Sequence, residues 1–254
     1  MTSIVLKVGY IGTGYNGFQR QPNQPHAHTI QGALEQALLE ATGKRTPLAS
    51  AGRTDKGVHA IGQMVQFETE STIPVHRYVP ILNRLLPEEI RVYESWKAKE
   101  GFHVRHDALR KTYVYRLDLN PVPGLLRSPY VLHFPHKRDL VLMDHALGTL
   151  LGTHDFKAFA SRFSTVENTI RTIHEVGIHV TEDGLMTIRI TGSGFLQHMV
   201  RIIVGTLLDV GKGRFDTSVF EKAIASGQRS DLGKTASPKG LMLESIQYKE
   251  GVLG

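Results

Sequence analysis

The segment IRTIHEVGIHVTEDGLMTIRITG, residues 170–192, decides between two classes of fold. Apolar and polar residues alternate on both sides of the pair Asp183-Gly184, which predicts two strands joined by a tight turn. Strands joined by so short a connection must run antiparallel. The segment therefore argues against a purely parallel sheet and favours the α+β class, in which helices and antiparallel strands form layers.

Further predicted elements lie on both sides of this hairpin. In the first half, we expect strands at residues 4–11, 45–50, 62–69 and 90–99, and helices at 29–43 and 75–86. In the second half, we expect strands at 111–119 and 240–248, and helices at 140–152, at 194–213 and from near Asp216. The order is similar in both parts, and it predicts two halves, residues 1–104 and 105–254.

The composition excludes several classes of protein. Hydrophobic residues make up 41% of the chain and charged residues 21%, as in globular proteins with a buried core. Because the chain has no cysteine, disulfides, thiolate metal sites and cysteine nucleophiles are excluded. The first residues, MTSIVLKVGY, read as a strand without signal-peptide features, and no apolar run approaches membrane-spanning length. We expect a cytoplasmic protein that does not bind membranes.

The charge balance bears on partners and ligands. The chain carries 30 Lys and Arg against 24 Asp and Glu, a net charge of +6. A basic surface favours an anionic partner such as nucleic acid, although the same excess also serves solubility. The 13 histidines form no H-E-x-x-H motif, and His103 and His106 lack a third ligand, so we expect no metal site.

The stretch GTGYNG, Gly12–Gly17, fits the pattern G-x-G-x-x-G after a predicted strand. A dinucleotide site also requires that this loop open directly into a helix whose N-terminus holds the pyrophosphate. Here Pro22 and Pro25 follow instead, and proline inside a helix removes a hydrogen bond and clashes. The stretch therefore favours a glycine-rich turn that faces RNA or the protein itself, with a dinucleotide site as a weaker alternative.

The stretch SAGRTDKGVHA, residues 50–60, holds one carboxylate, Asp55, between Arg53 and Lys56. Two nearby cations favour an ionised carboxylate if the fold turns them toward it, and the flanking glycines let a ligand approach closely. Such a carboxylate can act as a nucleophile, as a general base or as a stabiliser of developing positive charge. Asp-Lys-Gly is equally common in a simple hairpin connection. The segment alone supports both interpretations evenly.

The predicted helix at 194–213 contains an unusual cation. Apolar residues surround Arg201, while Gln197 and His198 lie four and three residues before it and would form a short polar stripe. A buried guanidinium needs a carboxylate or phosphate partner, and Asp55 is one candidate. The alternative is a helix edge that is open to water, where the arginine reaches solvent.

Tyr113 and Tyr115 alternate in phase on the strand at 111–119, beside Lys111 and Arg116. Aromatic side chains on a basic sheet face are suited to stacking on nucleic-acid bases. Core packing is the usual explanation for such tyrosines, and it is the preferred one when they are taken alone.

Several of these segments resemble the tRNA pseudouridine synthase A family. GRTDKGVHA resembles its catalytic loop, GYNGFQRQ its N-terminal segment and QGALEQAL its first helix. KTYVYRL resembles its active-site tyrosine strand, although Thr112 occupies a position that is often charged in the family. FLQHMVRIIVGTLLDVGKG and ASPKGLMLESIQY are similar to its C-terminal helix and closing strand. The resemblance extends from about residue 8 to residue 248, in the family's order.

The resemblance implies a fold and an activity. The fold would comprise two ferredoxin-like (RRM-like) halves that share a mixed, largely antiparallel sheet, with helices on one side and a central active-site cleft. The activity would be an isomerase reaction, conversion of uridine to pseudouridine at positions 38, 39 and 40 of the anticodon stem-loop after the base is flipped. The partners would be tRNA and a second copy of the chain, and neither a metal nor an organic cofactor would be needed.

The resemblance also implies roles for particular residues. Asp55 matches the catalytic aspartate, and Arg53 matches the residue that helps the target base out of its stack. Tyr113 matches the tyrosine that packs on the uracil, and Arg201 the basic partner of the aspartate. Leu241 matches the apolar wall opposite that tyrosine.

Two other classes of function remain open beside the synthase. One is a noncatalytic RNA-binding protein that uses the aromatic strand, and the other is a dinucleotide-dependent oxidoreductase that uses Gly12–Gly17. Within the synthase hypothesis, Asp55 can attack C1′ of the ribose, add to the uracil ring or remove the C2′ proton. The sequence does not distinguish these steps, and it gives Lys56 no role beyond local charge.

Overall fold

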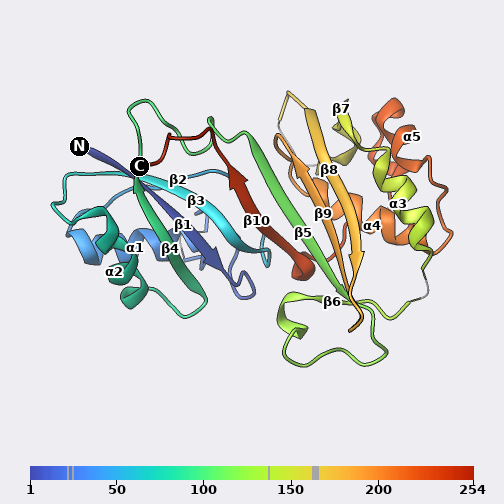
Figure 1. The fold of residues 1–254 in the computed structure, drawn as a ribbon, viewed down its shortest axis with the longest axis horizontal. Coiled ribbons are helices and arrows are strands. Elements are labelled where there is room, and N and C mark those ends of the chain that lie inside the picture. Colours follow the sequence, from blue (N-terminus) through green and yellow to red (C-terminus); the bar gives the residue numbers. More distant parts are fainter. Residues whose placement is uncertain (22, 25, 137, 162–165) are drawn as a thin grey trace. The chain divides into compact units, whose positions relative to one another are not determined.

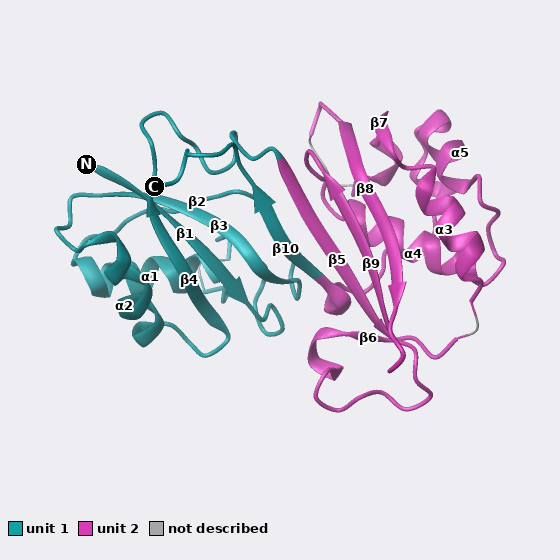
Figure 2. Ribbon diagram, in the orientation of Figure 1, with its two compact units in different colours: residues 1–109, 242–254 teal, residues 110–241 magenta. Residues whose placement is uncertain are grey.

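The computed structural model describes residues 1–21, 23–24, 26–136, 138–161 and 166–254 (Figure 1). The chain forms two compact units, residues 1–109 with 242–254, and residues 110–241 (Figure 2). Each unit combines helices with a mainly antiparallel sheet, which confirms the predicted α+β class. The division differs from the expected halves 1–104 and 105–254. Strand β10 (Leu241–Gln247) pairs in parallel with β3 (His59–Thr69), so the end of the chain belongs to the first unit.

The sheet of the first unit is built around β1 (Thr2–Tyr10). This strand pairs antiparallel with β3 on one side and with β4 (Ile90–Lys97) on the other. A short strand, β2 (Ala49–Ser50), is antiparallel to β3. Val5 on β1 is fully buried in a cluster with Met64, Phe102 and Val104, so apolar side chains cover the sheet on that face.

Helices α1 (Ile30–Thr42) and α2 (Tyr78–Leu85) complete the first unit. The Thr29 side chain accepts a hydrogen bond from the Gly32 N–H, and Gly43 ends α1 in the left-handed conformation with a φ of 71°. Thr29 therefore caps the helix and Gly43 closes it, as the sequence predicts.

The second unit holds β5 (Arg110–Asp118), β6 (Leu132–His133), β7 (Gly152–Asp155), β8 (Ile170–Val180) and β9 (Leu185–Gly192). The order β5-β9-β8-β7 is antiparallel throughout, and β6 pairs in parallel with β5. Strands β8 and β9 form the predicted hairpin, with Gly184 in its turn at a φ of 77°. Helices α3 (Leu140–Gly148), α4 (Met199–Gly211) and α5 (Val219–Ser226) lie together in this unit (Figure 1).

Five short 3₁₀ segments connect the described elements: Val75–Arg77, Ser128–Tyr130, Lys157–Phe159, Arg229–Asp231 and Pro238–Gly240. Within the described ranges, no helix is long and apolar enough to cross a membrane.

The structure corrects several expected boundaries, and the helix expected at 140–152 ends at Gly148. Helix α4 begins at Met199 because His198 adopts the left-handed conformation, with a φ of 65°. Gln197 and His198 therefore precede the helix, and the predicted polar stripe with Arg201 does not exist on one helical face. The strand expected at 45–50 is reduced to the two residues of β2, and the helix expected near Asp216 begins at Val219.

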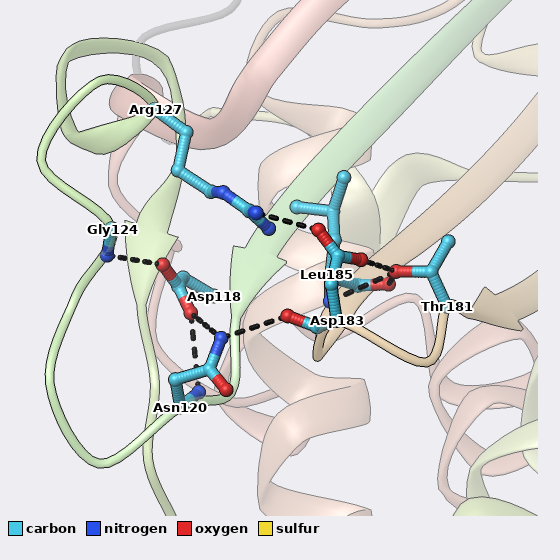
Figure 3. A network of polar contacts seen from close by, with 7 residues as sticks. All are labelled: Asp118, Asn120, Gly124, Arg127, Thr181, Asp183 and Leu185. Atoms are coloured by element: carbon cyan, nitrogen blue, oxygen red, sulfur yellow. Dashed lines mark hydrogen bonds and ion pairs between the residues drawn. The ribbon is translucent and has the colours of Figure 1, made fainter.

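A buried carboxylate fixes the connection between β5 and β6 (Figure 3). Asp118 is 2% exposed and accepts hydrogen bonds from the Gly124 N–H at 2.8 Å and from both nitrogens of Asn120, at 3.1 and 2.8 Å. Burial alone would raise the pKa of Asp118, but these N–H donors and the charge of Arg127 lower it below its usual value. Arg127 in turn pairs with Asp183 of the β8–β9 turn at 2.5 Å, so the connection is tied to that hairpin.

Candidate functional site

The segment around Asp55 is a hairpin connection that contains a hydrogen-bonded turn. It joins β2 to β3, which are antiparallel, so the hairpin interpretation is confirmed. The Val58 N–H donates to the Asp55 carbonyl at 3.1 Å, and Gly57 has a φ of 79°. A positive φ at the third position of a four-residue turn is typical of type II turns and favours glycine there. The turn leaves Asp55 half-buried, with exposed Arg53 and Lys56 nearby in the chain.

The glycine-rich segment 12–17 packs directly against this loop. The Cβ of any other residue at position 12 would lie 2.0 Å from the Val58 carbonyl oxygen, and at position 17 it would lie 2.9 Å from the Thr54 carbonyl oxygen. The Phe18 N–H donates to that same Thr54 carbonyl at 3.1 Å. Glycine therefore permits the close approach of two backbone segments, and the expectation of a turn that faces the protein is confirmed.

The structure contradicts the interpretation of this segment as a dinucleotide site. The helix that follows, α1, begins only at Ile30, capped by Thr29. A pyrophosphate site requires the loop to open directly into a helix, and here the loop opens against residues 54–58 instead. Pro22 and Pro25, on which the sequence argument depended, lie outside the described residues.

Buried polar side chains form hydrogen bonds that hold the loop around Asp55. The Tyr10 hydroxyl lies 2.8 Å from Thr54 Oγ1, and Gln63 Nε2 donates to the Gly52 carbonyl at 2.8 Å and to the Tyr10 hydroxyl at 3.3 Å. Tyr10, Thr54 and Gln63 are 4%, 7% and 0% exposed. Burial raises the pKa of Tyr10 to about 12, although its hydrogen bonds to Thr54 and Gln63 oppose the shift. The phenol is therefore neutral near pH 7.

His59, the residue after Val58, is a structural histidine. Its side chain is 4% exposed, and its Nδ1 accepts a hydrogen bond from the Gly12 N–H at 3.1 Å. An imidazole nitrogen that accepts a hydrogen bond carries no proton, so this contact fixes the tautomer of the ring. His59 thereby adds a second link between the glycine-rich segment and the end of the Asp55 loop.

In the second unit, Tyr113 and Tyr115 make different kinds of contact. Tyr113 is 8% exposed, and its ring meets Phe195 edge-on with centroids 5.2 Å apart. Tyr115 is fully buried, and its hydroxyl donates to the Ser237 carbonyl at 2.8 Å. Burial raises the pKa of Tyr115, although the nearby Arg201 charge opposes the shift. Core packing therefore accounts for Tyr115.

Arg201 holds the segment that leads into β10. Its Nε donates to the Ala236 carbonyl at 2.8 Å, and the Ala236 N–H donates to the Arg201 carbonyl at 3.0 Å. Arg201 as a whole is half-buried. Leu241 follows this segment and is 5% exposed. Arg201 and Tyr115 thus fix adjacent carbonyls, at Ala236 and Ser237, shortly before Leu241.

The predicted site residues fall into two groups. Arg53 and Asp55 belong to the first unit, and Tyr113, Arg201 and Leu241 belong to the second. Within the described residues, no group of three or more histidine and carboxylate side chains is arranged to hold a metal ion.

Sequence reasoning missed the supporting residues. Tyr10 and Gln63 each look like an ordinary residue on a predicted strand, and Phe195 looks like one more apolar residue of the helix predicted at 194–213. The one signal in the sequence is Gln63, a polar residue within the largely apolar strand β3. A glutamine that is buried there needs hydrogen-bond partners.

Comparison with known proteins identifies relatives over nearly the whole chain. The family described as tRNA pseudouridine synthase matches residues 7–107 and 146–249. The tRNA pseudouridine synthase A of Shouchella clausii is 41% identical over 249 residues, which cover 98% of this chain and 94% of that protein. The tRNA pseudouridine synthase A of Bacillus subtilis is 40% identical over 243 residues, 95% of this chain and 97% of that protein.

Proposed function

Because this chain belongs to the tRNA pseudouridine synthase family, we propose that it isomerises uridine to pseudouridine in tRNA, with Asp55 as its catalytic residue. The finer proposal is that the target uridines are positions 38, 39 and 40 of the anticodon stem-loop. The reaction breaks the bond from C1′ of the ribose to N1 of uracil and forms a bond from C1′ to C5. The C5 proton is lost and N1 gains one, so no atom or electron is gained or lost overall.

One observation carries the assignment to Asp55. The backbone on both sides of this residue is fixed, by Phe18 N–H to the Thr54 carbonyl and by Val58 N–H to the Asp55 carbonyl, each at 3.1 Å. A half-buried carboxylate on so fixed a backbone has little freedom beyond its own side-chain rotations. Catalytic groups that are held in place before the substrate binds lower the entropic cost of reaching the transition state.

The Asp55 carboxylate suits each of three chemical roles. It can attack C1′, add to the uracil ring, or remove the C2′ proton, and all three need an oxygen with a free lone pair close to the sugar and base. Arg53 is exposed on the same loop, and we assign it the role of supporting the flipped nucleotide. Unstacking a base costs a few kcal/mol, which contacts of this kind offset.

The residues of the second unit would complete the binding of the uracil. We propose that Tyr113 packs on the ring and that Leu241 forms an apolar wall. The edge-on contact with Phe195 fixes the Tyr113 ring, which supports a role as a stacking surface. Arg201 would act as the basic partner of Asp55. The bond from its Nε to Ala236 limits the positions that its guanidinium can take.

We also propose that the protein acts in the cytoplasm as a homodimer that binds tRNA. Light scattering on the free protein and on its tRNA complex tests the stoichiometry. A mass of one chain per complex contradicts the dimer.

The experiment that tests the function is an isomerisation assay on an unmodified anticodon stem-loop within full-length tRNA. Pseudouridine retains a carbodiimide adduct that stops reverse transcription, so each modified position can be mapped. We expect stops at positions 38, 39 and 40 wherever a uridine occurs there. The noncatalytic RNA-binding alternative predicts salt-sensitive tRNA binding without product at any protein concentration.

A further inference from the structure

A buried hydroxyl lies directly behind the catalytic loop without being part of it. The Tyr10 hydroxyl, near the end of β1, is 2.8 Å from Oγ1 of Thr54, the residue that precedes Asp55. Both side chains are almost fully buried. A hydrogen bond between two buried hydroxyls is costly to lose, because neither group can turn to water instead.

Gln63 orients this pair. The Met64 N–H donates to Gln63 Oε1 at 3.2 Å, which settles which end of the amide is the oxygen. The other end, Nε2, has two protons, and it donates to the Gly52 carbonyl and to the Tyr10 hydroxyl. One buried amide therefore links the start of the loop, at Gly52, to the residue that holds Thr54.

An irregularity in β3 brings these side chains together. Val8 of β1 faces Gln63, but Tyr10 faces Ala60, so β3 contains one residue more than β1 over this stretch. Extra residues of this kind bend a strand and re-aim its side chains, and they are frequent beside active sites. In this protein the irregularity lies between Ala60 and Gln63, shortly after the Asp55 turn.

We propose that the Tyr10 hydroxyl, oriented by Gln63, is a positioning group for Asp55 that acts through Thr54. It touches neither the substrate nor the reacting atoms. It fixes the side chain of Thr54, whose carbonyl is already fixed by Phe18, so that the carboxylate on the next residue keeps its direction. The inference rests on the proposed function, since it assumes that the direction of Asp55 matters for the reaction.

The charge state of Tyr10 is consistent with this role. Because burial raises its pKa to about 12, the phenol keeps its proton across the range in which tRNA is handled. The bond to Thr54 is therefore present at every working pH, and the group neither gives up nor takes up a proton during turnover.

The test compares two variants that each remove one buried tyrosine hydroxyl from the same unit. Tyr10→Phe removes the bond to Thr54. Tyr78→Phe is the matched control, since the Tyr78 hydroxyl is buried without a hydrogen-bond partner among the described residues. We expect Tyr10→Phe to slow single-turnover pseudouridine formation about tenfold, with the Kd for tRNA changed less than about twofold. We expect Tyr78→Phe to match the wild type in both quantities.

Variants of Thr54 test whether Tyr10 acts through this residue. Thr54→Ser keeps the hydroxyl and should retain most of the rate, whereas Thr54→Val should lose about as much as Tyr10→Phe. If both losses reflect one hydrogen bond, the double variant is no slower than either single variant. Multiplied losses in the double variant, or a wild-type rate for Tyr10→Phe, would overturn the inference. Thr54→Val alone gives the answer if Tyr10→Phe does not fold.

A second measurement separates this inference from the proposed function. Hydrogen exchange of the backbone amides at residues 52–58 reports the order of the loop without any substrate. We expect faster exchange there in Tyr10→Phe and Thr54→Val, and unchanged exchange in Tyr78→Phe. Unchanged exchange in Tyr10→Phe contradicts the inference whether or not the wild type forms product. If the wild type forms none, the proposed function fails, and the exchange result alone decides whether Tyr10 positions the loop.

Discussion

The replacement of Gly12 by alanine tests how the Asp55 loop is held. The added Cβ would lie 2.0 Å from the Val58 carbonyl oxygen and 2.7 Å from its carbon. Both atoms belong to the backbone, so no side-chain rotation relieves the clash. Real Cβ atoms essentially never come closer than 3.0 Å to such atoms, so the two segments must separate by about 1 Å.

This displacement reaches Asp55 by a short route. Val58 closes the turn onto the Asp55 carbonyl, and Gly12 also donates to His59 at the start of β3. A misplacement of about 1 Å in a catalytic constellation costs roughly a hundredfold in rate. We therefore expect Gly12→Ala to lower the single-turnover rate about a hundredfold. The free energy of unfolding should fall by about 1–3 kcal/mol, as for other overpacked sites.

The assay is pseudouridine formation under single-turnover conditions, with tRNA binding and urea unfolding measured on the same preparation. Gly148→Ala is the control, because an added Cβ there meets nothing within 4 Å. It should leave the rate unchanged. If Gly12→Ala folds normally and reacts at the wild-type rate, the close approach of residue 12 to residue 58 does not hold the loop, and the reasoning fails.

Three further predictions concern stability. Tyr115→Phe leaves the Ser237 carbonyl without its donor and should lower the free energy of unfolding by about 1–2 kcal/mol in urea; an unchanged value contradicts this. Tyr10 has a folded pKa of about 12 against 10.0 for an ordinary tyrosine, so its contribution, about 3 kcal/mol, is complete below pH 10 and is lost as the pH rises toward 12. Stability of Tyr10→Phe should therefore fall less steeply than that of the wild type across this window, and parallel curves would contradict it. Asp118→Ala removes the acceptor of the Gly124 N–H, so it should lower the free energy of unfolding by about 1–3 kcal/mol and hasten proteolytic cleavage of residues 119–131. Because the pKa of Asp118 is lowered in the folded protein, its contribution to stability is present above about pH 4 and is lost in acid. The stability of the variant should therefore lack this dependence on pH.

The sequence predicted most elements whose signals are local. The cap at Thr29 depends on a side-chain hydrogen bond, and the end of α1 at Gly43 and the turn at Gly184 depend on the backbone freedom of glycine; all three occur. The start of α4 was predicted too early because His198 adopts a left-handed conformation, which nothing in its neighbours indicates. Residues 242–254 were assigned to the wrong half because parallel pairing between β10 and β3 is a long-range contact without a local signal.

For the candidate site, too, the sequence predicts the features with local signals and not those that depend on tertiary contacts. The glycine-flanked Asp55 was recognisable because loops that present a side chain need special backbone conformations. Its supports were not recognisable, because Tyr10 lies 44 positions from Thr54 and 53 positions from Gln63 in the sequence. The close approach of Gly12 to Val58 is likewise a property of tertiary packing, although the glycine pattern itself can be recognised in the sequence.

The central claim is that the Asp55 carboxylate carries out the isomerisation. The most direct measurement is the single-turnover rate of pseudouridine formation by Asp55→Asn, a nearly isosteric change, beside the wild type and Asp144→Asn, an exposed aspartate on α3. The proposed mechanism predicts that Asp55→Asn binds tRNA like the wild type but reacts about a thousandfold more slowly or not at all, while Asp144→Asn reacts normally. An Asp55→Asn protein that folds, binds tRNA and forms pseudouridine at the wild-type rate would contradict the claim.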